Sequence, residues 1–173
     1  MRHPTAYIHP MACVDDSIKD IGPGTKIWQF ASVIRGSIIG ERSVIGNCAI
    51  VDASRIADNV RIQPGAVIFP GAMIWQDVFV GPNVVLCNDF WPSVDKDGWN
   101  YEALLNGDLT SIRIYPGASI FAGAKIMPGI TIGEGARVAA NAIVKQDVPD
   151  NCLYGRDGSI EAIRGQPRRQ RTC

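Results

Sequence analysis

The stretch from Ile56 to Leu86 reads IADNVRIQPGAVIFPGAMIWQDVFVGPNVVL, and its spacing decides the fold. A branched aliphatic residue recurs at every sixth position: Ile56, Ile62, Ile68, Ile74, Val80 and Leu86. Four residues after each of the first five comes a small or β-branched residue: Val60, Ala66, Ala72, Val78 and Val84. Turn-forming pairs such as Pro64-Gly65 lie inside each period. A helix face would repeat at three and four residues and a half-buried strand at two, so neither fits.

A period of six with turn residues in every period predicts a parallel β-helix. Each hexad would form one short strand and one corner, and three hexads would close a triangular coil. The aliphatic residue that begins each hexad would point into the prism, and stacked coils would bury each other's apolar rows. A β-sandwich of short strands is the alternative, but it would not keep strict phase through consecutive hexads. We therefore predict an all-β fold.

Composition limits the classes of protein to consider. The chain has 173 residues, which fits one compact domain, and its formal net charge is zero, so bulk charge gives no reason to expect a nucleic-acid partner. No apolar run is long enough to span a bilayer, and residues 1–10 lack the apolar core of a signal peptide. The five cysteines are scattered without a Cys-x-x-Cys spacing. That usage predicts reduced thiols and a cytoplasmic protein.

The repeat extends over most of the chain. It opens at Ile8, slips in phase by one residue at Asp20 and again between Val51 and Ile56, and returns from Ile114 to Val144. We expect the slips at corners, because a slip inside a strand would turn its apolar residues outward. Val148-Pro149-Asp150 should end the repeat, since proline cannot donate to the next rung. The prediction is a β-helix domain of residues 1–150 and a tail of residues 151–173, with a short helix considered over 159–164.

One long segment interrupts the hexads. Residues 87–111 contain no repeat but carry two tryptophans, Trp91 and Trp99, and a tyrosine, Tyr101. Irregular segments of this length are uncommon inside a compact domain and are usually functional or disordered. The aromatic residues argue against disorder. We predict an ordered loop that leaves one corner of the prism and can reach a neighbouring subunit.

Several segments resemble a known family. Residues 142–150, AIVKQDVPD, resemble the closing coils of hexapeptide acyltransferases. Residues 24–30 (GTKIWQF), 60–63 (VRIQ) and 77–83 (DVFVGPN), with Asn88-Asp89 after them, resemble the bacterial nucleotide-sugar N-acetyltransferases of lipopolysaccharide O-antigen biosynthesis. The resemblance covers roughly residues 7–150. It implies a left-handed coil, a homotrimer, a nucleotide-linked (dTDP or UDP) amino sugar as acceptor, and acetyl-CoA bound between neighbouring prisms.

The chain departs from the family at three places. Gln29 stands where the family commonly has histidine, and Trp91-Pro92-Ser93 lacks the arginine that often follows Asn-Asp. Lys145-Gln146 replaces the usual Thr-Lys of the closing segment. The first two departures leave the nucleotide and the sugar open, and the third leaves the contact to the CoA phosphates open.

The histidine content favours an amine as the acceptor. The only histidines, His3 and His9, precede the first complete coil, and transfer to a hydroxyl usually needs a histidine base. A sugar amine with a pKa lowered toward ~7.7–8.0 is partly neutral and already nucleophilic. The catalytic candidates are Asn88, whose amide would stabilise the oxyanion, and Asp89, which would orient the ammonium group and take its proton. The alternative is that this pair is a corner turn that starts the loop.

The binding candidates follow from the same resemblance. Trp28 and Phe69 either stack on a base or sugar or cover a corner, and Gln63 has the same two interpretations. The substrate-binding candidates are Trp28, Gln29, Gln63, Phe69 and Trp91. Ala122 and Ala140 would hold the pantetheine arm through their backbone, or would be small inward residues of the repeat. Lys145 and the tail arginines, Arg168 foremost, would bind the CoA phosphates, unless the tail is simply solvated.

Other functions remain to be weighed. An O-acetyltransferase or an acyltransferase with a non-sugar acceptor would share the repeat. A zinc carbonic anhydrase needs about three protein ligands, usually histidines, which His3 and His9 cannot supply, so no metal is expected. A scaffold without activity is a further alternative, although the aromatic loop and the arginine-rich tail argue against it. Cys87 has no evident base beside it, so a structural role is expected for its thiol.

Overall fold

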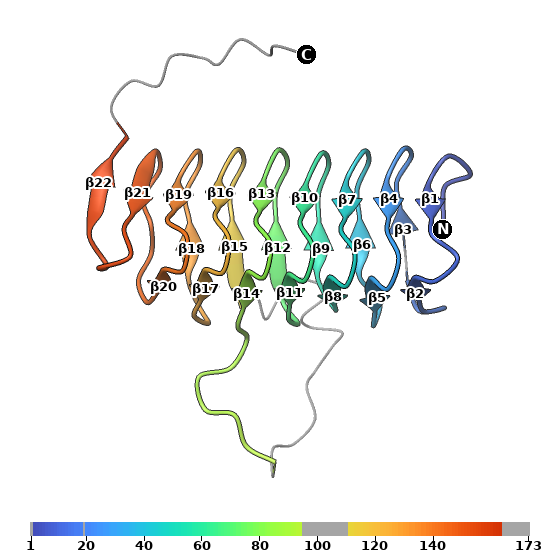
Figure 1. The fold of residues 1–173 in the computed structure, drawn as a ribbon, viewed down its shortest axis with the longest axis horizontal. Helices are drawn as coiled ribbons and strands as arrows, with labels where there is room; N and C mark the ends of the chain where they lie inside the picture. The colour runs from blue at the N-terminus through green and yellow to red at the C-terminus, as the bar shows by residue number, and fades with distance from the viewer. Residues whose placement is uncertain (1, 19, 95–110, 164–173) are drawn as a thin grey trace.

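The computed structural model describes residues 2–18, 20–94 and 111–163. Short strands stack into three parallel sheets that run along a prism (Figure 1). This is the parallel β-helix that the repeat predicts, with the left-handed coil that the family resemblance implies, and it confirms the all-β prediction.

The strands divide among the three faces. Sheet B contains β1 (Tyr7–Ile8), β4 (Lys26–Ile27), β7 (Val44–Ile45), β10 (Arg61–Ile62), β13 (Phe79–Val80), β16 (Ser119–Ile120), β19 (Arg137–Val138), β21 (Cys152–Tyr154) and β22 (Ile160–Ala162). Sheet C contains β2 (Cys13–Val14), β5 (Ser32–Ile34), β8 (Ile50–Asp52), β11 (Val67–Ile68), β14 (Val85–Leu86), β17 (Lys125–Ile126) and β20 (Ile143–Val144). Sheet A contains β3 (Asp20–Ile21), β6 (Ile38–Ile39), β9 (Arg55–Ile56), β12 (Ala72–Ile74), β15 (Ile112–Ile114) and β18 (Thr131–Ile132).

The core consists of the aliphatic residues that begin the hexads. Ile62 is fully buried and lies in register between Ile45 of the previous coil and Val80 of the next. The residues four positions later, such as Val60 and Ala66, are also fully buried. Burial of one isoleucine side chain contributes about 1.5–3 kcal/mol to the stability of the fold. Each coil buries such an aliphatic residue on every face of the prism. The predicted inward positions are therefore confirmed.

The phase slips fall at corners, as predicted. The interval from Val51 to Ile56 is one residue short, yet Ile56 still pairs with Ile39 and Arg55 with Ile38. The residue lost is therefore taken from corner 53–54, where Ala53 adopts a left-handed φ of 41°. Because the strands on either side keep their register, their aliphatic residues stay inside.

Polar side chains reinforce the corners of the early coils. Asp52 is only 3% exposed, and its carboxylate accepts hydrogen bonds from the Arg35 guanidinium, with Nε 2.5 Å from Oδ1 and a second bond to Oδ2. The buried Ser37 hydroxyl donates to the Ile34 carbonyl at 2.7 Å and accepts from the Ser54 amide at 3.3 Å. The Ser37 bonds satisfy backbone groups that a corner would otherwise bury without partners, and the Arg35 bonds pair the buried carboxylate of Asp52.

The C-terminal end of the prism differs from the prediction. Val148 still bridges to Ile132 before Pro149, and β21 then adds another parallel strand to sheet B, so the proline does not end the coil. The helix considered over residues 159–164 is absent from the described part of that segment, where β22 pairs antiparallel with β21. Pairing with an open sheet edge supplies hydrogen bonds that a helix this short cannot match.

The excursion begins directly after β14. Residues 87–94 extend away from the prism (Figure 1), and the side chains at its far end, Trp91 and Val94, are 83% and 98% exposed. The rest of the predicted loop, including Trp99 and Tyr101, lies outside the described residues. In the described ranges, no helix has both the length and the apolar character needed to cross a membrane.

Candidate active site

The corners stack into ridges, two of which border sheet C. The B–C ridge joins sheet B to sheet C and consists of corners 9–12, 28–31, 46–49, 63–66, 81–84, 121–124 and 139–142. The C–A ridge joins sheet C to sheet A and consists of corners 15–18, 35–37, 53–54, 69–71, 127–130 and 145–147, together with the start of the excursion at 87–94. The predicted site residues that the structure describes fall on these two ridges.

The B–C ridge brings three predicted substrate-binding residues together. Trp28, Gln29 and Gln63 line a pocket of about 290 Å³ together with Asn47. The Trp28 ring is 39% exposed and lies 5.6 Å from the Tyr7 ring, tilted by 60°. Residues from three successive coils therefore present an indole face and amide groups to one hollow, which suits a ligand with a planar and a polar part.

The C–A ridge carries both catalytic candidates. Asn88 and Asp89 are half-buried, and the Asp89 Oδ1 atom accepts the Trp91 amide hydrogen at 2.8 Å. This bond holds the carboxylate in a local turn. Phe69, 39% exposed, lies one coil earlier, where its amide donates to the Leu86 carbonyl at 3.4 Å. Phe69, Asn88, Asp89 and Trp91 thus share one ridge.

Cys87 adjoins this pair, but its thiol is not poised to react. Burial raises the pKa of Cys87, and the positive charge of Lys125 offsets that effect only in part. A thiol held protonated is a poor nucleophile, which supports the structural role expected for Cys87.

Another hollow lies at the C-terminal end of sheet C. Lys145 and Gln146 line a pocket of about 450 Å³ together with Asn141, Tyr154 and Arg156. Two cationic side chains border this pocket, against one carboxylate, that of Asp157. The tail segment folds back because β21 pairs with β19, and the Tyr154 hydroxyl donates to the Ile143 carbonyl at 3.1 Å.

The two alanines predicted for the cofactor lie near this pocket. Ala122 is exposed and Ala140 is half-buried, so the interpretation of both as inward residues is wrong. They follow the inward aliphatic residue by two positions, which places them on the outer corner. The Ala122 carbonyl accepts the Asn141 amide at 2.9 Å, which links the two corners. Arg168, predicted with them, lies outside the described residues.

A single prism keeps the two ridges apart. Between them runs sheet C, whose strands have two or three residues and span about 3.3 Å per residue. The pocket at Trp28 and Gln63 and the Asn88-Asp89 pair therefore lie on opposite edges of one face. The structure groups the predicted residues by ridge but does not unite them within one chain.

Both histidines lie in the first coil. The His9 Nδ1 atom accepts the Met11 amide at 3.1 Å, and the His3 Nδ1 atom lies 2.9 Å from the Thr5 hydroxyl oxygen. Neither ring therefore lies near the Asn88-Asp89 pair. Among the described residues, no group of three His, Cys, Asp or Glu side chains is arranged to hold a metal ion.

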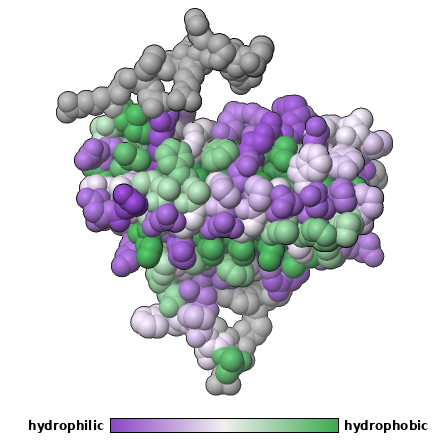
Figure 2. Space-filling model, in the orientation of Figure 1, coloured by the Kyte–Doolittle hydropathy of each residue, from purple (hydrophilic) through white to green (hydrophobic). Residues whose placement is uncertain are grey.

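The repeat analysis missed two features. Arg156 was considered only with the other tail arginines, because nothing in the sequence shows that β21 returns to sheet B. Trp75 and Tyr115 stack on each other, although each directly follows the inward isoleucine of a sheet A hexad. The sequence signal for this stack is that both aromatic residues occupy the same position of consecutive sheet A hexads. Figure 2 shows apolar side chains gathered in bands that run along the prism, with hydrophilic side chains beside them.

The architecture defines the protein as a hexapeptide-repeat β-helix protein. Residues 20–53 match the family model described as bacterial transferase hexapeptide (six repeats). No curated protein sequence matches the chain.

Solved structures share the fold at low sequence identity. A mutant of AntD, an N-acyltransferase from Bacillus cereus in complex with dTDP and Coenzyme A, is 18% identical and has a TM-score of 0.68 over 87% of this chain and 86% of that one. The UDP-N-acetylglucosamine acyltransferase of Francisella novicida is 17% identical, with a TM-score of 0.61 over 92% of this chain and 68% of that one. The chain spans 56% of the acetyltransferase domain of PglB from Neisseria gonorrhoeae in complex with acetyl coenzyme A, at 93% coverage of this chain, 17% identity and a TM-score of 0.49.

Proposed function

We propose that this protein is an acetyl-CoA-dependent N-acetyltransferase that acts on the amino group of a nucleotide-linked (dTDP or UDP) amino sugar. The observation that carries the proposal is the half-buried Asn88-Asp89 pair on a ridge of the β-helix, remote from both histidines. AntD, which shares the fold, is an N-acyltransferase in complex with dTDP and Coenzyme A. That combination of ligands supports the substrate class proposed here.

Assembly would bring the two ridges together. The outward side chains of sheet C include Ile50, Val67 and Val85, which are in register and form an apolar column. In a homotrimer, the C–A ridge of one subunit would face the B–C ridge of the next. The Asn88-Asp89 pair would then adjoin the pocket at Trp28 and Gln63. Light scattering at micromolar concentration should give the mass of a trimer, and a monomer mass would contradict this arrangement.

The donor would occupy the groove beside sheet C. The cations Lys145 and Arg156 border one pocket at its C-terminal end, and forked guanidinium donors suit phosphate oxygens. The outward backbone at Ala122 and Ala140 lies along the path from that pocket toward the middle coils and would hold the pantetheine arm. Arg168 is proposed as a further phosphate ligand from the tail.

The chemistry needs little acid–base help. The neutral sugar amine attacks the thioester carbonyl, a C–N bond forms, the C–S bond breaks, and CoA leaves as the thiol after the amine proton is transferred. Asn88 would donate to the oxyanion, and Asp89 would orient the ammonium group and accept its proton. Holding amine and thioester together supplies about 7–11 kcal/mol of the barrier.

The reaction would take place in the cytoplasm, on a precursor of lipopolysaccharide O-antigen. The described cysteines, Cys13, Cys48, Cys87 and Cys152, are all free thiols, which fits a reducing compartment.

The test is incubation of the protein with acetyl-CoA and a panel of amino sugar nucleotides, with thiol release followed. Release with an amino sugar nucleotide, and none with the corresponding hydroxyl sugar, is the expected result. Release with hydroxyl acceptors alone would point to O-acetyl transfer, and no release with any acceptor would point to a scaffold.

A further inference from the structure

Two aromatic rings stand on the outside of the prism where sheet A ends. Trp75 follows β12 and Tyr115 follows β15, and their ring centroids are 4.7 Å apart with only 6° between the planes. The Trp75 amide donates to the Ile114 carbonyl and the Tyr115 amide to the Ile132 carbonyl, both at 2.9 Å. Because both backbones are fixed by the ladder, the stacked pair is a rigid wall across two coils.

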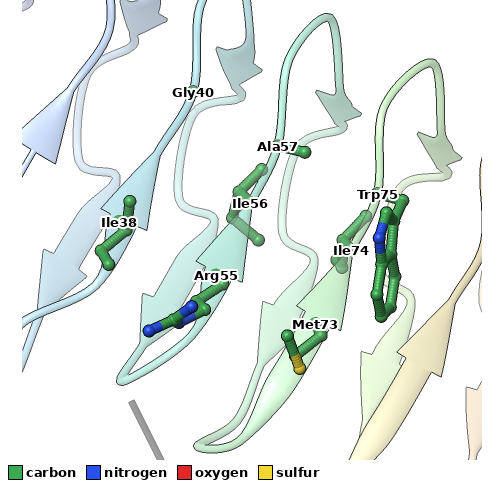
Figure 3. Close-up of a pocket in the computed structure, with 8 residues that line it drawn as sticks. All are labelled: Ile38, Gly40, Arg55, Ile56, Ala57, Met73, Ile74 and Trp75. Atoms are coloured by element: carbon green, nitrogen blue, oxygen red, sulfur yellow. The ribbon is translucent and has the colours of Figure 1, made fainter. Parts of the chain in front are cut away.

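Beside this wall, the equivalent positions of the two preceding coils carry residues with little or no side chain. At the position that Trp75 occupies, the two preceding coils carry Gly40 and Ala57, which are too small to cover the sheet. The result is a pocket of about 270 Å³ on the outer face of sheet A. Figure 3 shows Trp75 as one wall, with Met73 and Arg55 projecting from the strands beside it. One face of the indole meets Tyr115, and the other borders this pocket.

Charge differs between the two sides of the stacked pair. On the Tyr115 side, a second hollow is bordered by the acids Glu134, Asp147 and Asp150. On the Trp75 side, Arg55 is the charged residue among those that line the pocket. An anionic group is therefore disfavoured beside Tyr115 and favoured beside Trp75.

We propose that this pocket binds the base of a nucleoside diphosphate. The base would stack on the Trp75 face opposite Tyr115 and extend the aromatic pair to three rings, while Arg55 would pair with phosphate oxygens through its forked donors. The choice of ligand rests on the proposed function, in which both substrates carry a base and a diphosphate. The base is that of the sugar acceptor, because the proposed function places the CoA phosphates in a separate pocket at Lys145 and Arg156.

The test is calorimetric titration of the assembled protein, separately with dTDP, UDP, GDP, ADP and CoA. Trp75→Ala and Arg55→Gln should each weaken binding of the occupant about fivefold to a hundredfold, the range expected for loss of base stacking or of a charged pair. Arg113→Gln is the matched control. Arg113 projects from sheet A next to Met73 in register, as Arg55 does, but it does not line the pocket, so binding should change less than twofold.

The titrations also identify the source of the base. Loss confined to dTDP, UDP or GDP assigns the pocket to the acceptor and supports the proposal. Loss confined to ADP and CoA overturns it, because the CoA phosphates would then bind at Arg55 and not at Lys145 and Arg156. Unchanged affinity for every ligand in Arg55→Gln and in folded Trp75→Ala overturns it. A changed mass in light scattering with unchanged affinity also overturns it, because the face then serves subunit contact.

Failure of this inference is separable from failure of the proposed function. If thiol release and nucleotide affinity are both normal in the two variants, the proposed nucleotide pocket is refuted and the proposed transferase activity is retained. If nucleotide binding weakens in both variants but the protein releases no thiol with any amino sugar, the nucleotide pocket is supported and the transferase activity is refuted. If Trp75→Ala does not fold, Arg55→Gln and its Arg113→Gln control decide alone.

Discussion

The two ridges that border sheet C are built from the same repeat, yet they differ in regularity. The B–C ridge uses a four-residue corner in each coil that the structure describes. The C–A ridge uses two residues at 53–54, three at 35–37, 69–71 and 145–147, and four at 127–130, and it opens into the long excursion after β14. A corner on the outside of the prism can accept an insertion at small cost, because the closing entropy rises slowly with loop length.

Under the proposed function, this difference predicts different tasks for the two ridges. Side chains on the regular ridge stand one rung apart, about 4.8 Å, and form an evenly spaced surface for holding a ligand. Side chains at the start of the excursion are freed from that spacing, so Asn88 and Asp89 can be placed against a reacting atom. If this division of tasks holds, changes on the irregular ridge should affect turnover, and changes on the regular ridge should affect apparent binding.

The largest effect is expected at Asn88. Asn88→Ala removes the proposed oxyanion donor and should lower turnover about 100- to 1,000-fold, the usual loss for one such donor. The measurement is turnover at saturating acetyl-CoA and acceptor. His9→Ala is the control and should stay near wild type. A folded His9→Ala protein without turnover, together with a normal Asn88→Ala protein, would refute catalysis without a histidine base.

Asp89→Asn should have the next largest effect, about 100-fold, because a general base typically contributes at least that much. The acidic limb of the pH–rate profile should shift in this variant if the carboxylate handles the amine proton. In the wild type, the midpoint of that limb should follow the pKa of the sugar amine when the acceptor is changed. A profile identical to the wild type in shape and height would exclude Asp89 from proton transfer.

The donor pocket should give a smaller effect, confined to binding. Lys145→Ala and Arg156→Ala should each raise the Michaelis constant for acetyl-CoA about fivefold to tenfold, since each removes one exposed charge-assisted contact worth about 1 kcal/mol. Steady-state kinetics with acetyl-CoA varied would measure this. Lys125→Ala, an exposed lysine on the same sheet outside the pocket, is the control. If the Michaelis constant for acetyl-CoA is the same in Lys145→Ala, Arg156→Ala and the control, the CoA phosphates bind elsewhere.

The smallest effect is expected on the regular ridge. Trp28→Ala should raise the Michaelis constant for the acceptor about threefold to tenfold and spare turnover, because stacking on one ring face is worth about 1 kcal/mol. Phe121→Ala is the matched control: Phe121 occupies the same corner position on a later coil and is equally exposed, at 39%. A turnover loss in Trp28→Ala as large as that in Asn88→Ala would remove the distinction between the ridges.

The sequence predicts the inside of this protein far better than the outside. The hexad rule gives every inward residue from Ile21 to Val144 because burial leaves one solution for an aliphatic residue at each turn. It even tolerates the short interval before Ile56, since a corner can absorb the missing residue. The interpretation of Ala122 as an inward residue is wrong because it lies two positions after Ile120, on the outer corner, whereas the inward small residue is Ala124.

Other features escape the repeat because they depend on pairing between distant segments. Strand β22 has no hexad of its own, and its conformation is decided by the edge of β21 rather than by local preference. The Trp75–Tyr115 stack joins residues separated by the whole excursion, so only the register of β12 with β15 reveals it. The candidate site was predicted as a set of residues, but its division between two ridges needed the structure.

Strand β22 also bears on how the protein avoids becoming a fibre. A parallel β-helix is a short segment of an endless stack, and the edge of its last coil is a template on which another chain could continue. The antiparallel direction of β22 breaks the stacking rule at sheet B, and all its residues are exposed. At the described end of sheet B, the outermost strand therefore runs against the direction of the stack, so a further hexapeptide coil could not add to β22 in the parallel arrangement that the other strands share.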